Sequence, residues 1–160
     1  MRLYVLRHGK AAARAGWIGG DDDRPLTPEG EAAMLREARA LKELGVTVER
    51  IVTSPLARAR RTAEIVAAEL GLGETLAEDA ALAHGFDVRR LAKLIAAHAP
   101  VESLMVVGHE PDLSATVGEL IGGGAVALKK GGLARVDLDA PRPGGGELVW
   151  LLTPPLLGSG

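Results

Sequence analysis

The chain has 160 residues, a formal net charge of −2 at pH 7 and no cysteine. This length suits one domain with a single core, and the 47% of apolar residues exclude disorder for the bulk of the chain. The balanced charge gives a nucleic-acid role little electrostatic support, and two Trp, one Tyr and one Phe are too few to stack bases. The lack of cysteine excludes disulfides and thiolate chemistry.

Membrane association also lacks a signal in the sequence. No apolar stretch is long enough to span a bilayer, and the N-terminus leads into a strand without a signal-peptide pattern. We therefore expect a soluble, cytoplasmic protein. Nothing in the pattern indicates an oligomeric state.

The first predicted strand is an apolar run over residues 3–6 that ends at Arg7, His8 and Gly9. A continuous apolar run is typical of a strand buried on both faces. In open α/β sheets, ligands bind at the carboxyl ends of the strands, so Arg7 and His8 are expected at a ligand site. Taken alone, His8 could equally be a hydrogen-bonded polar residue that ends a strand.

The same pattern returns in the strand predicted over residues 102–107, which ends at Gly108 and His109. Between the two strands, Ser54 and Pro55 are predicted to cap a helix that carries Arg58 in its first turn. The positive end of a helix dipole favours an anion there, so a cation is locally unfavourable. A bound phosphate would resolve this conflict.

Other charged residues near these stretches have simpler explanations. Arg60 is expected to pair with Glu64 or Glu69 on the helix surface. Asp21–Asp23 lie in a glycine-containing loop, where we expect solvated or capping carboxylates and not a metal site, because EF-hand spacing is absent. Lys10 either attracts phosphate or is solvated.

Strands that alternate with helices predict an α/β fold with three α/β/α layers and a mostly parallel central sheet. The last two strands are expected to form an antiparallel hairpin at one edge. One domain is predicted over residues 1–153, with a loose tail over 154–160. The remaining predicted elements are helices over 28–44, 55–70, 88–97 and 111–120, and strands over 48–53, 75–76, 133–138 and 147–152.

If the strand ends meet, Arg7, His8, Arg58 and His109 share one crevice. Two guanidinium groups supply planar forks for phosphoryl oxygens, and a second histidine adds a donor. Neighbouring cations lower the pKa of His8, which leaves a lone pair that can attack phosphorus. Such a set would repel a divalent cation, so neither a metal nor another cofactor is expected.

Four stretches resemble the histidine phosphatase superfamily, and in particular its small branch, the SixA-like phosphohistidine phosphatases. One is its Arg-His-Gly signature at Arg7-His8-Gly9, and the others cover residues 23–30, 53–63 and 107–114. The resemblance implies a phosphoglycerate mutase-like fold. It also implies that His8 is the phosphorylated nucleophile, that Arg7 and Arg58 hold the phosphoryl oxygens, and that His109 completes the phosphate-binding pocket.

The resemblance further implies a metal-independent phosphatase that acts on a phosphorylated protein, most simply on phosphohistidine. Two alternatives stay open: a broad-specificity phosphatase of small phosphate esters, and a non-catalytic phosphoprotein-binding module. Larger members of the superfamily use a carboxylic acid from the middle segment to protonate the leaving group. The candidates here for that role are Glu78, Asp79 and His84.

Overall fold

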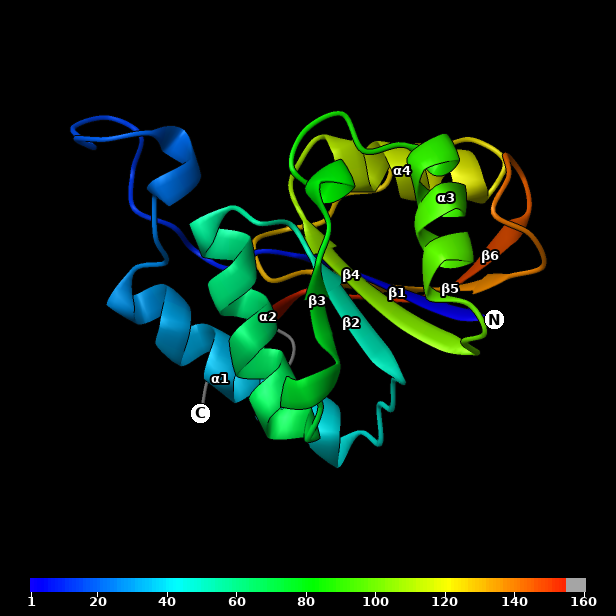
Figure 1. The fold of residues 1–160 in the computed structure, drawn as a ribbon, viewed down its shortest axis with the longest axis horizontal. Coiled ribbons are helices and arrows are strands. Elements are labelled where there is room, and N and C mark those ends of the chain that lie inside the picture. Colours follow the sequence, from blue (N-terminus) through cyan, green and yellow to red (C-terminus); the bar gives the residue numbers. More distant parts are fainter. Residues whose placement is uncertain (155–160) are drawn as a thin grey trace.

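The computed structural model describes residues 1–154, which form a six-stranded sheet flanked by helices (Figure 1). The strand order across the sheet is β3-β2-β4-β1-β5-β6. The strands are β1 Arg2–Arg7, β2 Arg50–Thr53, β3 Leu76–Glu78, β4 Ser103–Gly108, β5 Leu133–Leu138 and β6 Gly146–Leu152.

The sheet is mostly parallel, as the alternation of strands and helices predicts. Strands β1, β2, β3 and β4 run in one direction, and β5 is antiparallel to β1. The predicted antiparallel hairpin is confirmed, because β6 pairs antiparallel with β5 at one edge. Strand β5 itself lies one position in from that edge.

Four helices cover the two faces, so the predicted α/β/α layering is confirmed. Helices α1 (Pro28–Glu43) and α2 (Ala57–Leu70) pack on one face, and α3 (Val88–His98) and α4 (Asp112–Leu120) on the other. Successive residues of β1 alternate between the two cores. Leu3 and Val5 belong to the core under α3 and α4, whereas Tyr4 and Leu6 belong to the core under α1 and α2.

The N-terminus of α1 forms as its sequence predicts. The Thr27 side chain accepts a hydrogen bond from Gly30 N at 2.9 Å, and Pro28 takes the first helical position. A Cβ atom at Gly30 would overlap the carbonyl of Lys10, so only glycine allows this close approach. This contact fixes α1 against the segment that follows β1.

The predicted start of α2 is wrong by two residues. The helix begins at Ala57, and its N-cap residue Leu56 makes no side-chain capping bond. The hydroxyl of Ser54 accepts instead from Leu56 N at 3.2 Å and lies 2.8 Å from His109 Nε2. Ser54 therefore caps a turn ahead of the helix and contacts a histidine on a neighbouring strand end.

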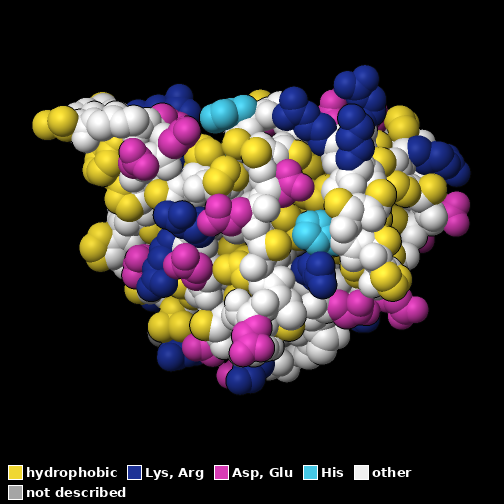
Figure 2. Space-filling view, in the orientation of Figure 1, with side chains coloured by type: hydrophobic (Ala, Val, Ile, Leu, Met, Phe, Trp, Pro, Cys, Tyr) yellow, Lys and Arg dark blue, Asp and Glu magenta, His cyan; other side chains and the backbone are white. Residues whose placement is uncertain are grey.

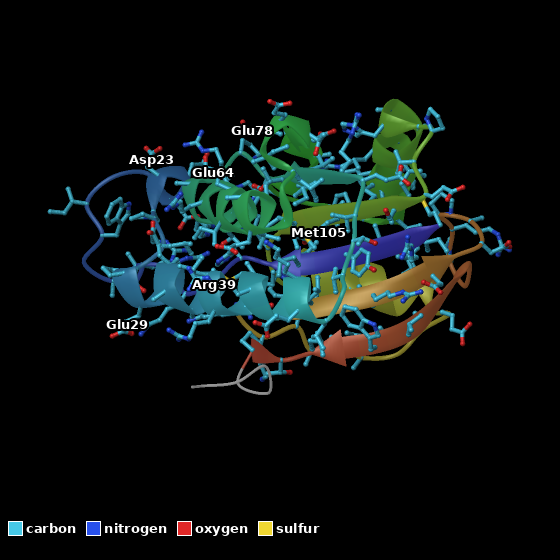
Figure 3. The ribbon with its side chains drawn as sticks, turned by 90° about the horizontal axis from the view of Figure 1, so that it is seen from below. Asp23, Glu29, Arg39, Glu64, Glu78 and Met105 are labelled. Atoms are coloured by element: carbon cyan, nitrogen blue, oxygen red, sulfur yellow. The ribbon has the colours of Figure 1, made fainter. Side chains whose placement is uncertain are left out.

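The middle segment contains more short elements than its pattern suggests. Strand β3 follows one 3-10 turn, Gly73–Thr75, and precedes another, Ala80–Leu82. Figure 3 shows Glu78, the last residue of β3, at the sheet margin, and Met105 on β4 in its middle. Most of the tail predicted over 154–160 lies outside the described residues. Within residues 1–154, none of the helices combines the length and apolar character that crossing a bilayer requires.

A buried carboxyl group lies on the core side of α1. Glu37 is only 3% exposed, and neither of its oxygens has a hydrogen-bond partner among the described residues. Burial raises the pKa of Glu37 to about 8. The folded chain therefore keeps this proton at neutral pH, whereas the unfolded chain releases it near the ordinary glutamate value.

This difference predicts that Glu37 contributes a loss of stability as pH rises from about 5 to about 8. At Glu37 the unfolded state binds fewer protons in that window, and the contribution is on the order of 3–5 kcal/mol. Below about pH 6.5, His8 and His109 act in the opposite direction, because burial lowers their pKa values. Glu37→Gln should therefore gain stability relative to the wild type as pH rises through this window, in urea unfolding at several pH values. Glu43→Gln, an exposed change near the end of the same helix, should leave the pH dependence intact. An unchanged slope in Glu37→Gln would contradict the assignment.

Candidate active site

Three parallel strands end side by side at one margin of the sheet. Arg7 lies opposite Gly108 in the β1–β4 pair, and Thr53 lies opposite Val107 in the β2–β4 pair. The residues that follow these strands remain hydrogen-bonded across them. His8 N donates to Gly108 O at 3.1 Å. The strand pairing thus brings His8, Ser54 and His109 together.

The start of α2 is tied to the same place through Thr62. Its hydroxyl accepts from Gly9 N at 3.1 Å and donates to the carbonyl of Arg58 at 2.8 Å. From the sequence we expected Arg7, His8, Arg58 and His109 to share one crevice, and the structure places all four side by side. They contribute to a hollow of about 230 Å³ lined by Arg7, His8, Ala11, Arg14, Arg24, Arg58, His109, Glu110 and Lys130.

The ring of His8 is held in one tautomer. Its Nδ1 lies 2.7 Å from the carbonyl oxygen of Gly9, which can only accept, so Nδ1 carries the proton. Burial lowers the pKa of His8 to about 4, and the charges of Arg58 and Arg7 add to the effect, although the bond to Gly9 opposes it. At neutral pH the ring is uncharged, and Nε2 has a free lone pair.

The ring of His109 has the complementary arrangement. The hydroxyl of Ser54 lies 2.8 Å from His109 Nε2, and no other acceptor among the described residues contacts it, so we assign its proton to this bond. The proton of His109 is then on Nδ1, which is buried and has no partner among the described residues. Burial lowers the pKa of His109 to about 3, with His8 and Arg58 contributing. The ring centroids of His8 and His109 are 5.2 Å apart.

Both predicted arginines lie at this site, Arg58 buried and Arg7 half-buried, and each donates hydrogen bonds to a neighbouring loop. Arg7 Nη1 donates to the carbonyl of Leu128 at 3.0 Å. Arg58 donates from Nη1 to the carbonyl of Asp21 at 2.8 Å and from Nη2 to its carboxylate at 3.1 Å. The Nε atoms of Arg7 and Arg58 are buried without a partner in the described part of the chain. Each guanidinium is therefore fixed in position, and its Nε–H remains as a donor without a partner in the described part of the chain.

Asp21 has a larger role than the capping or solvated carboxylate that the sequence suggests. Its carboxylate also accepts from Arg24 Nε at 3.1 Å, and Arg24 donates to the carbonyl of Ala12 at 2.7 Å. Burial acts to raise the pKa of Asp21, but Arg24 and Arg58 outweigh it and hold that pKa below its ordinary value. Asp21 thus links the loop after β1 to the first turn of α2.

The middle segment supplies no carboxylate to the pocket lining. Glu78 forms an ion pair with Arg60 at 3.5 Å, and Asp79 accepts from Ala81 N at 2.8 Å. His84 is closer, because its ring stacks on His109 with centroids 6.4 Å apart, but its side chain is 71% exposed. The acidic residue that does line the pocket is Glu110.

Several pocket residues were not predicted as functional. Arg14 and Lys130 come from loops whose conformation the sequence pattern does not specify. Arg24 and Glu110 belong to two of the stretches that carry the family resemblance, and this membership could have indicated them as site residues. Lys10, by contrast, forms an exposed ion pair with Glu29 at 2.6 Å and does not line the hollow.

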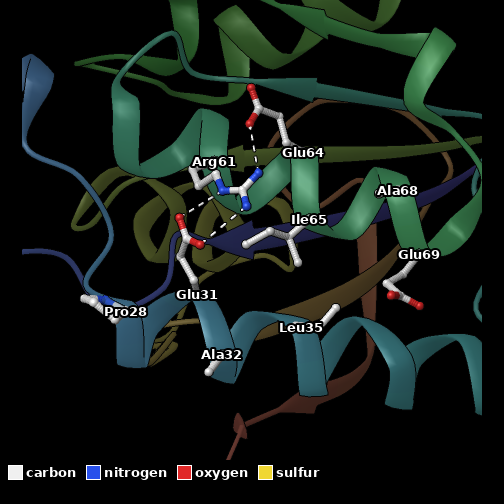
Figure 4. A pocket seen from close by; sticks show the side chains of 9 residues that line it. All are labelled: Pro28, Glu31, Ala32, Leu35, Arg61, Glu64, Ile65, Ala68 and Glu69. Atoms are coloured by element: carbon white, nitrogen blue, oxygen red, sulfur yellow. Dashed lines mark hydrogen bonds and ion pairs between the residues drawn. The ribbon is translucent and has the colours of Figure 1, made fainter.

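A larger hollow of about 490 Å³ lies between α1 and α2 (Figure 4). Its floor contains Leu35 and Ile65, and Arg61 at its rim is already paired with Glu31 and Glu64. No histidine lines this hollow, and its arginine has no unsatisfied charge. Phosphoryl chemistry is therefore better placed at the histidine pocket.

Charged side chains of both signs also lie outside the pocket. Figure 2 shows acidic and basic side chains interspersed over one face of the molecule, in keeping with the net charge of −2. Arg60 is paired with Glu64 at 4.0 Å, as expected for a surface residue. Among residues 1–154, no three His, Asp or Glu side chains come together as they would around a metal ion.

Arginines and an uncharged histidine at parallel strand ends give this α/β protein a cationic pocket. The sequence pattern of the histidine phosphatase superfamily (branch 1) matches residues 3–84, and the chain belongs to this superfamily, whose members are phosphatases and mutases. An uncharacterized protein of Picosynechococcus sp. is 47% identical over 118 residues, which cover 71% of this chain and 68% of that protein.

Two solved structures extend the similarity over almost the whole chain. The protein histidine phosphatase SixA in complex with tungstate is 30% identical, with a TM-score of 0.87, and the match covers 99% of this chain and 100% of that one. A protein from Agrobacterium tumefaciens described as a phosphohistidine phosphatase SixA is 28% identical, with a TM-score of 0.78, over 95% and 97% of the two chains. Both share the phosphoglycerate mutase-like fold.

The bond between Ser54 and His109 predicts a specific effect on turnover. Ser54→Ala leaves the buried Nε2 of His109 without its donor and allows the other tautomer, so we expect kcat for an aryl phosphate to fall about tenfold. Ser103→Ala is the matched control, because Ser103 is also buried and accepts a backbone N–H, but lies at the opposite end of β4. Equal losses in the two variants would contradict a role through His109.

Proposed function

We propose that the protein is a phosphatase that works through a phosphoryl group bound covalently to His8 Nε2. One observation carries the proposal: beside this neutral imidazole, three buried polar atoms, on Arg7, Arg58 and His109, have no partner in the described part of the chain. An unpartnered buried donor is costly. The oxygens of a phosphoryl group in the pocket would be its natural acceptors.

In the first step, the lone pair of His8 Nε2 attacks phosphorus, and the bond to the leaving group breaks with its electron pair. The ring becomes a phosphorylated imidazolium, and its Nδ1 proton stays hydrogen-bonded to the Gly9 carbonyl. In the second step, water attacks phosphorus, and the pair of the breaking P–N bond returns to Nε2. Orthophosphate leaves, and the neutral ring is restored.

The two arginines and His109 stabilise the phosphoryl group while it transfers. Phosphoryl transfer depends mainly on positioning and on neutralising charge at the equatorial oxygens. Arg7 and Arg58 are fixed by Leu128 and Asp21, so they need little reorganisation during the reaction. His109 donates from Nδ1 to the same oxygens, in the tautomer that Ser54 selects.

We further propose that the substrate is phosphohistidine on a protein. The SixA structure supports this through its similarity over the whole chain. A phosphorylated imidazole is a better leaving group than an alkoxide, which suits a pocket that no middle-segment carboxylate lines. Next to the pocket, a hollow of about 460 Å³ shares Arg14 and Arg24 with it and leaves room for a protein-borne group.

The test measures phosphate release from a phosphohistidine-bearing protein in the presence of a chelator. We expect release by the wild type and its loss in His8→Ala. His98→Ala, a change at the end of α3 where His98 contacts Arg50, should keep the wild-type rate. Hydrolysis of an aryl phosphate without release from the phosphoprotein would indicate that small phosphate esters are the substrates. Inactivity on both, with phosphoprotein binding retained, would indicate a binding module.

A further inference from the structure

The pocket contains one carboxylate among several cations. Of the nine residues that line it, Glu110 is the only acid, and it directly follows His109. A carboxylate repels a bound phosphoryl group, so its presence here opposes phosphate binding. Because Glu110 weakens phosphate binding in a pocket that otherwise favours it, we expect this carboxylate to have a role in the reaction.

The local structure holds Glu110 in place and leaves it one free oxygen. Its Oε1 accepts a hydrogen bond from Ser114 N at 3.1 Å in the first turn of α4. No donor among the described residues contacts Oε2. The other carboxylate near the site, Asp21, has both oxygens engaged by Arg24 and Arg58. Glu110 is therefore the pocket carboxylate with capacity to accept a proton.

We propose that Glu110 Oε2 accepts the proton of the water that hydrolyses the phosphoryl group on His8. This inference rests on the covalent route proposed above. The water oxygen forms its bond to phosphorus, one water proton moves to Glu110, and the electron pair of the P–N bond returns to His8 Nε2. Glu110 then releases its proton to solvent, which restores the carboxylate.

The two halves of the reaction differ in their need for a proton acceptor. Formation of the phosphorylated His8 needs no acceptor, because the attacking nitrogen carries a lone pair and no proton. Hydrolysis does need one, because water must lose a proton as it adds. Removing Glu110 should therefore slow the second half and spare the first, whereas a leaving-group acid would show the opposite pattern.

The experiment follows an aryl phosphate by rapid mixing and measures phosphorylated protein after an alkaline quench. In Glu110→Gln, whose amide oxygen can still accept from Ser114, we expect an initial burst of aryl alcohol at the wild-type rate. Steady-state turnover should fall about a hundredfold, and phosphorylated His8 should accumulate. Glu119→Gln, an exposed change on α4, should behave as wild type.

A second variant separates proton acceptance from folding. Glu110→Ala should be equally slow, and added formate should restore part of its steady-state rate by acting as a free carboxylate. Turnover within twofold of wild type in Glu110→Gln, or a slowed burst with no accumulated intermediate, would overturn the proposal. Absence of His8-dependent turnover in the wild type would refute the covalent route itself, and this inference with it.

Discussion

The chemistry of this protein depends on the parallel pairing of β4 with β1 on one side and β2 on the other. Because these strands run in one direction, their carboxyl ends meet at the same margin, and His8, His109 and Ser54 follow them. The hydrogen bond from His8 N to Gly108 O continues the pairing past the strand end. The hydrogen bonds of the sheet therefore hold the site residues in fixed positions.

Burial and charge then act on the histidines in the same direction. Removal from water and nearby arginines both disfavour the imidazolium, so the cations that would hold phosphate also keep the His8 lone pair free. Backbone carbonyls and Asp21 offset the cost of removing the guanidinium groups of Arg7 and Arg58 partly from water. The donors left over, on Arg7, Arg58 and His109, support the proposal that the pocket binds an anion.

Much of this arrangement could be predicted from the sequence, because the apolar strands are long and end abruptly in polar residues. A cation in the first turn of α2 marked Arg58 as unusual. The prediction that Ser54 caps α2 is wrong, because a serine before a proline fits the start of a turn as well as the start of a helix. The pairing of Asp21 with Arg58 joins residues far apart in the chain, and Glu110 stands out only once the pocket lining is known. Neither has a local pattern that would reveal it.

The central claim is that the phosphoryl group is transferred twice, first from the substrate to His8 Nε2 and then to water. The stereochemical course of hydrolysis tests it most directly, using a phosphate ester whose phosphorus is made chiral by oxygen isotopes and sulfur. Two successive in-line displacements each invert phosphorus, so the account predicts net retention in the released thiophosphate. Net inversion would show a single direct attack by water and would contradict a covalent role for His8.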